Sequence, residues 1–160
     1  MKKKIRIKQI LACLLVFLWM ILIFVFSSQI ESESSKLSTG ITDFILELLN
    51  PIRLSLAWSK EGFHHFIRKM GHFGEYMILS LLFTYALRVN LSMSWKSLRL
   101  LTVSFCFFYA VTDEFHQYFV SGRVASFVDV CIDSSGALFA FILYFLFRRK
   151  RNFKNKRYEL

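Results

Sequence analysis

Apolar stretches long enough to cross a membrane constrain this chain more than any other feature. An α-helix needs about 20 residues to span the ~30 Å hydrocarbon core of a bilayer. Residues 10–26 contain no charged side chain. Three further stretches are interrupted by charges only near one end, so the predicted spans cover about residues 10–26, 70–87, 100–120 and 126–147. We therefore expect an all-α membrane protein with four transmembrane helices, forming a single domain over residues 1–160.

The composition agrees with a membrane protein and excludes several other classes. Hydrophobic residues make up 55% of the chain, which is too many for an intrinsically disordered protein. Three cysteines in 160 residues do not provide the framework of a disulfide-stabilised domain. The formal net charge of +10 is not gathered on a soluble basic surface, so no nucleic-acid partner is expected. A chain that is both apolar and basic is typical of a membrane protein with basic cytoplasmic ends.

The distribution of Lys and Arg predicts the orientation of the four spans. Of 21 basic residues, 15 lie in residues 1–9, 88–99 and 148–160, which four spans place on one side of the membrane. The positive-inside rule assigns that side to the cytoplasm. Both termini, including the basic tail 148–160, and the loop between the second and third spans are therefore expected in the cytoplasm, where anionic lipids attract them.

The segment between the first and second spans is expected on the outer face and has an amphipathic pattern. Its apolar residues recur at helical spacing, at Leu37, Ile41, Phe44, Ile45, Leu48 and Leu49. Pro51 then ends the predicted helix. We expect this helix to lie on the outer membrane surface or to cap the bundle. Contact with a ligand is the alternative interpretation.

Ionisable residues embedded in the spans are predicted to meet at the outer end of the bundle. Because successive spans alternate in direction, the charged parts of the last three fall in the same leaflet. Helical spacing also places them on one face of each span. On the fourth span, at residues 126–147, the charged face also carries Gly136, Ala137 and Ala140, whose small size allows helices to approach closely. The expected binding residues are Lys69, His72, Glu75, Tyr76, Asp113, Glu114, His116, Gln117, Arg123, Asp129 and Asp133.

The charges of this cluster do not balance. It holds five carboxylates, and each would cost about 2.5–3.5 kcal/mol at the middle of a membrane helix. The permanent cations are Lys69 and Arg123, which leave three negative charges in excess when both histidines are neutral. Such an excess predicts a bound cation, a protonated carboxyl group or a water-filled cavity. The sequence leaves these three alternatives open.

Three interpretations of the cluster also remain open: a structural polar network, a substrate or proton pathway, and a metal site. The candidate metal ligands are His72, Glu75, Glu114 and His116, whose side chains suit a divalent ion. In a catalytic interpretation, Glu114 or Asp113 is the general base, with His116 or His72 as its partner. Their spacing differs from the metalloprotease pattern HExxH, and no cysteine joins them.

Several short strings, taken in order, resemble the VanZ-like family of bacterial membrane proteins. The strings are FSSQ at 26–29, RKMGHFGEY at 68–76, DEFHQ at 113–117, GR at 122–123, FVDV at 127–130 and DSSG at 133–136. The resemblance covers roughly residues 10–147. It implies a small multi-pass protein of the bacterial plasma membrane and cell envelope. It also implies an accessory role in resistance to teicoplanin-type glycopeptide antibiotics.

Two functional hypotheses follow. In the first, which we favour, the protein is not an enzyme, and its outer-leaflet cluster binds a lipid headgroup, a lipid-linked wall precursor or a glycopeptide. Arg68, Lys69 and Arg123 would then meet anionic groups. In the alternative, the protein is a membrane-embedded enzyme that acts on a lipid-linked substrate with a divalent metal as cofactor. The partners expected under either hypothesis include membrane lipids.

Overall fold

The computed structural model describes residues 2–29, 39–45, 47 and 60–157, and these residues form helices and connecting turns without a strand. The long helices are α1 (Lys2–Ser27), α3 (Lys60–Asn90), α4 (Trp95–Gln117) and α5 (Phe127–Arg157). A short helical segment also covers residues 39–45. The prediction of an all-α protein is therefore confirmed. Helix α4 ends at Gln117, whereas the predicted third span continues to about residue 120.

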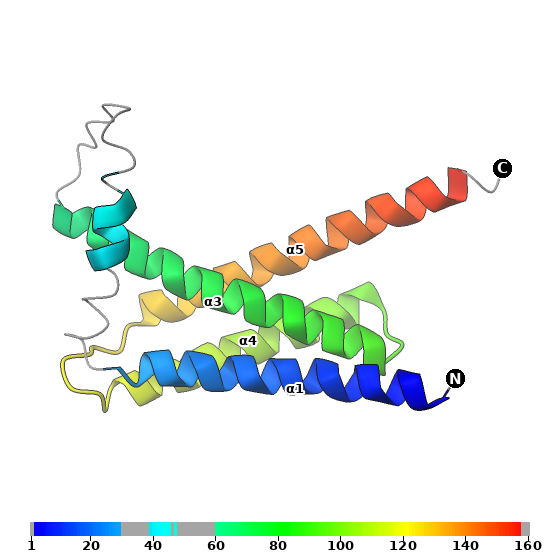
Figure 1. Cartoon of the computed structure of the whole chain (residues 1–160), viewed down its shortest axis with the longest axis horizontal. Coiled ribbons are helices and arrows are strands. Elements are labelled where there is room, and N and C mark those ends of the chain that lie inside the picture. The colour runs from blue at the N-terminus through cyan, green and yellow to red at the C-terminus, as the bar shows by residue number, and fades with distance from the viewer. Residues whose placement is uncertain (1, 30–38, 46, 48–59, 158–160) are drawn as a thin grey trace.

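The long helices alternate in direction along the bundle (Figure 1). The end of α1, the start of α3 and the connection between α4 and α5 lie together at one end, beside residues 39–45. We call this the 118–126 end, after the connection between α4 and α5. The start of α1, the α3–α4 connection and the end of α5 lie at the opposite end. The charged parts of α3, α4 and α5 are therefore at the same end of the bundle, as the alternation of spans predicts.

Helix α3 is central and packs against α1, α4 and α5. Its contact with α5 is close because α5 presents small residues. The Ser80 hydroxyl donates a hydrogen bond to the Ala137 carbonyl oxygen at 2.8 Å. At Gly136, a Cβ atom would overlap the backbone carbonyl of Phe73. This contact is therefore possible only without a side chain at position 136, as expected for helices that pack through small residues.

Helix α1 is attached to the bundle by hydrogen bonds from aromatic side chains to backbone carbonyls. The Trp19 indole N–H donates to the Glu75 carbonyl oxygen at 2.9 Å, and the Tyr109 hydroxyl donates to the Met20 carbonyl oxygen at 2.7 Å. Buried apolar side chains fill the space between the helices. The main ones are Ala12, Val16, Ile23, Tyr76, Leu79, Ala86, Cys106, Ala110, Val130 and Ala137. The bundle thus combines an apolar core with hydrogen bonds between helices.

Two segments of the described chain are long and apolar enough to cross a membrane, Ile7–Ser27 in α1 and Phe127–Arg148 in α5. Helices α3 and α4 carry the ionisable residues of the predicted cluster within their length. The helical segment 39–45 agrees with the predicted amphipathic helix, and it exposes Ile41 and Phe44 while burying Thr42. The other residues of that prediction, Leu37, Leu48, Leu49 and Pro51, lie outside the described residues.

Candidate functional site

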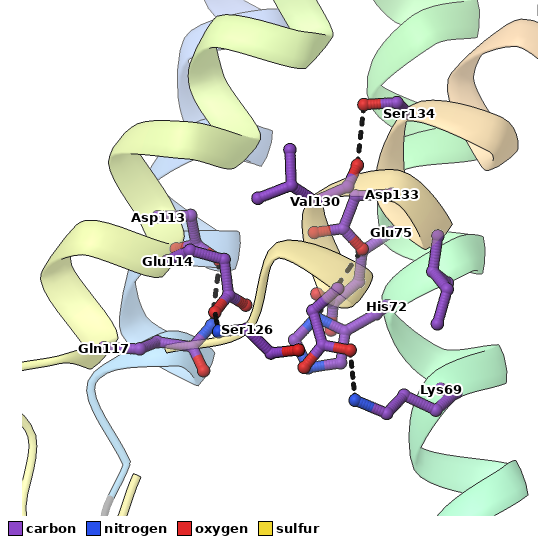
Figure 2. A network of polar contacts seen from close by, with 12 residues as sticks. Lys69, His72, Glu75, Asp113, Glu114, Gln117, Ser126, Val130, Asp133 and Ser134 are labelled. Atoms are coloured by element: carbon purple, nitrogen blue, oxygen red, sulfur yellow. Dashed lines mark hydrogen bonds and ion pairs between the residues drawn. The ribbon is translucent and has the colours of Figure 1, made fainter. Parts of the chain in front are cut away.

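Helices α3 and α5 place charged side chains opposite one another at successive turns. Lys69 of α3 forms an ion pair with Asp129 of α5. One turn further along both helices, the Nδ1 atom of His72 lies 3.7 Å from the Oδ1 atom of Asp133. Figure 2 shows Lys69, His72 and Asp133 lying between the two helices. Because α3 and α5 run in the same direction, the spacing of three or four residues repeats on both and keeps the two pairs in register.

Helix α4 contributes a chain of hydrogen bonds that ends on the connecting loop. The Gln117 amide donates to Asp113 Oδ2 at 3.1 Å, and its carbonyl oxygen accepts from the Arg123 guanidinium at 3.2 Å. Gly122, just before the arginine, has a φ of 80°, a left-handed conformation that glycine adopts at little cost. The turn at Gly122 brings Arg123 back toward α4, where it is buried.

Arg123 also joins the loop to the end of α1. Its guanidinium donates to the carbonyl oxygens of Gln29 at 3.2 Å and Phe26 at 3.4 Å. Carbonyls at the C-terminal end of a helix lack partners within the helix, so a cationic donor is favourable there. The single side chain therefore connects α1, α4 and the loop that leads into α5.

The side chain of Glu114, a residue of α4, contacts the beginning of α5. Its Oε2 atom accepts a hydrogen bond from the backbone N–H of Ser126 at 2.8 Å, directly before the first residue of α5 (Figure 2). A carboxylate at this position satisfies a free N–H group and interacts favourably with the helix dipole. This contact gives the Glu114 side chain a structural role. Its predicted role as a general base stays a prediction.

His116 contacts α1. Its Nε2 atom lies 3.1 Å from the Ser28 hydroxyl, and its ring lies 4.4 Å from that of Phe24, measured between centroids. The neighbouring residues Asp113 and Gln117 are hydrogen bonded to each other. His116 therefore contacts the end of α1 directly, whereas Gln117 is connected to that end through Arg123.

A cavity of about 270 Å³ opens beside these residues. Its wall combines charged side chains of both signs with apolar ones. Arg68 belongs to this wall. It lies four residues before His72, and this spacing places both side chains on the same face of α3. The lining residues are Phe26, Ser27, Gln29, Ile41, Ile67, Arg68, Gly71, His72, Glu75, Asp113 and Arg123. The amphipathic segment therefore contributes to the cavity through Ile41, and the end of α1 through residues 26–29.

A group of potential metal ligands lies next to the cavity. One ligand atom from each of His72, Asp113 and Asp133 falls within 4.8 Å of the other two. Of the four ligands expected from the sequence, only His72 belongs to this group; Glu75, Glu114 and His116 do not. Tyr76, another expected binding residue, is fully buried in the core beneath the cluster. The arrangement has the chemistry to hold a cation among the helices and a charged group in the cavity.

Long apolar helices and a charged, partly buried cavity at one end of the bundle are features of a helical membrane protein. The family model VanZ/LLP1 matches residues 12–148. The chain therefore belongs to the VanZ/LLP1 family, and the resemblance seen in the sequence is confirmed. Comparisons with curated proteins and with solved structures gave no significant match. The family and the two apolar helices together indicate a membrane protein.

Proposed function

We propose that this protein crosses the bacterial plasma membrane four times, with both termini in the cytoplasm and the 118–126 end in the outer leaflet. Helices α3 and α4 contain 31 and 23 residues. At a rise of 1.5 Å per residue they are about 46 Å and 35 Å long, which exceeds the ~30 Å hydrocarbon core. The concentration of Lys and Arg at the opposite end supports this orientation.

The surface of the bundle also supports a lipid environment. Large apolar side chains are exposed along α1, α4 and α5, beyond what a soluble monomer usually shows. Examples are Leu14, Phe17, Leu100, Phe108, Phe139 and Ile142. In water these side chains would form an extensive apolar surface, whereas in a bilayer they would face acyl chains.

In this orientation, the cavity binds one of three ligands: the anionic headgroup of a lipid, a lipid-linked wall precursor, or a glycopeptide. The protein acts by binding and is not an enzyme. The observation that carries this proposal is the mixed wall of the cavity. Arg68 and Arg123 offer guanidinium groups suited to phosphate or carboxylate. Glu75 and Asp113 offer acceptors for hydroxyl or ammonium groups, and Ile41 and Ile67 offer apolar contact.

The proposal is tested by teicoplanin susceptibility in a bacterial host that expresses the chain. Wild type is compared with Glu75→Gln, which removes a charge from the cavity wall. The matched control is Glu47→Gln, the same change at an exposed position of the outer segment. We expect protection by wild type and Glu47→Gln and loss of protection by Glu75→Gln at equal expression. Equal protection by all three chains would contradict a role for the cavity.

The enzyme alternative is favoured by one observation, the grouping of His72, Asp113 and Asp133 beside the cavity. A metal ion held there would act as a Lewis acid toward a lipid-linked substrate. Lipid extracts from hosts with and without the protein separate the two proposals. A new lipid species that depends on wild type and disappears with Asp133→Asn would support the enzyme, whereas unchanged lipids together with protection would support binding alone.

A further inference from the structure

We infer that His72, Asp113 and Asp133 form a site for one divalent transition-metal ion between α3, α4 and α5. Each helix contributes one ligand, and one ligand atom from each residue lies within 4.8 Å of the other two. The site would therefore connect the three helices at the inner wall of the cavity. It differs from the set of ligands expected from the sequence and does not depend on the proposed function.

Unsatisfied buried oxygens are the independent observation that points to an ion. Asp133 has no exposed surface, and neither of its carboxylate oxygens has a hydrogen-bond partner among the described residues. The Oδ1 atom of Asp113, which is only 4% exposed, also has no such partner in the described chain. Buried polar atoms are nearly always satisfied, and a bound ion is one of the standard reasons for an exception. A metal ion would satisfy the oxygens of both aspartates.

The distances fit an ion with small adjustments. Around an ion with bonds of about 2.1 Å, tetrahedral ligand atoms lie about 3.4 Å apart. The observed 3.7 Å between His72 Nδ1 and Asp133 Oδ1 is already close to this value. The other separations, which are at most 4.8 Å, close with side-chain shifts of about 1 Å.

The surrounding residues would orient the ligands. The second oxygen of Asp113 accepts a hydrogen bond from Gln117, which is itself bonded to Arg123. Hydrogen bonds of this kind fix a ligating carboxylate and leave its other oxygen directed at the ion. The chain of contacts from the loop to Asp113 therefore has a function as a support for the site.

The ion would also neutralise the excess negative charge of the cluster. The cluster contains five carboxylates: Glu75, Asp113, Glu114, Asp129 and Asp133. Three cationic side chains, Arg68, Lys69 and Arg123, lie among them. The formal excess is two negative charges when both histidines are neutral, and a single divalent ion neutralises it. Since embedded charge is costly in a membrane, this neutralisation favours occupancy.

The ligand types narrow the identity of the ion. One imidazole and two carboxylates suit Mn²⁺, Fe²⁺ or Zn²⁺, whereas Ca²⁺ and Mg²⁺ prefer oxygen ligands alone. His72 and Asp113 line the cavity as well as the site. An ion bound to them would be reachable from the cavity by water or by an anionic group.

The test uses the full chain, purified in detergent with an affinity tag that contains no histidine and stripped with EDTA. Titration with Mn²⁺, followed by electron paramagnetic resonance, should reveal about one bound ion per chain, displaced by Zn²⁺ and not by equal Ca²⁺. Spin-echo modulation should show a coordinated imidazole nitrogen that is lost in His72→Gln. The isosteric changes Asp113→Asn and Asp133→Asn should weaken binding by at least about tenfold.

Two further variants keep the test decisive. Gln117→Ala leaves every ligand in place and should weaken binding by about 10–100-fold through loss of orientation. Glu47→Gln is the control and should bind like wild type. Absence of stoichiometric Mn²⁺ and Zn²⁺ binding by wild type would overturn the inference, as would unchanged affinity in both aspartate variants. If the wild-type chain binds metal but gives no teicoplanin protection, the result would count against the proposed function and leave the metal site standing.

Discussion

The contact between Gly136 and the backbone of Phe73 predicts how much stability the substitution Gly136→Ala would cost. Replacing Gly136 by alanine introduces a Cβ atom that overlaps the Phe73 carbonyl oxygen. The obstacle is backbone, so it cannot move aside as a flexible side chain would. Helices α3 and α5 would have to separate by about 1 Å to restore an ordinary contact.

The expected magnitude is the difference between two effects. Overpacking of a well-packed contact costs about 1–3 kcal/mol. Replacing a helical glycine by alanine returns up to about 1 kcal/mol through helix propensity. Because the obstacle is rigid, we expect a net loss of about 1–2 kcal/mol in the free energy of unfolding. For a chain of this size, the loss corresponds to a decrease of about 2–8 °C in Tm.

The assay is unfolding in detergent, followed by circular dichroism during heating and during titration with sodium dodecyl sulfate. The control is Gly74→Ala on α3, where a Cβ atom meets no heavy atom within 4 Å. This variant should be as stable as wild type or up to about 1 kcal/mol more stable. If Gly136→Ala and Gly74→Ala unfold alike, the close approach of α3 and α5 at this position is wrong.

Three further predictions concern the contacts around the site. Glu114→Ala removes the acceptor of the Ser126 N–H and should destabilise the chain by about 1–2 kcal/mol in the same titration, while a change near zero would exclude its role at the start of α5. Lys69→Asp and Asp129→Lys should each destabilise the bundle, and the double exchange should recover much of the loss; additive losses in the double-mutant cycle would refute the ion pair. Arg123→Gln should accelerate hydrogen exchange in residues 118–126 by about tenfold, and unchanged exchange would show that Arg123 does not hold the loop to α1.

The helices and the position of the charged cluster could be predicted because they depend on local properties. The length of each apolar stretch predicts a helix, and the alternation of direction brings the charged parts of α3, α4 and α5 to one end. Helical spacing likewise predicted that His72 and Asp133 face the interior of the bundle. Such inferences need only the sequence of each helix and the order of the helices.

The roles of individual side chains could not be predicted, because they depend on how each helix is rotated and how closely it approaches its neighbours. Asp113 and Glu114 are adjacent in sequence, yet one borders the cavity and the other bonds to the backbone before α5. His116 contacts Ser28, directly after the end of α1, across a separation of 88 positions in sequence. Arg68 was expected to meet an anionic group, but its place in the wall of this cavity depends on α3 beginning at Lys60, well before the predicted span.

The hydrogen bonds that hold α1 have a consequence for how this interface tolerates change in evolution. Trp19 and Tyr109 supply the donors, but the acceptors are the main-chain oxygens of Glu75 and Met20, which every amino acid carries. Substitution at the accepting position can therefore proceed without a matching substitution at the donor. Paired variation between homologous sequences would under-report this interface, even though deletion of either aromatic donor would loosen it.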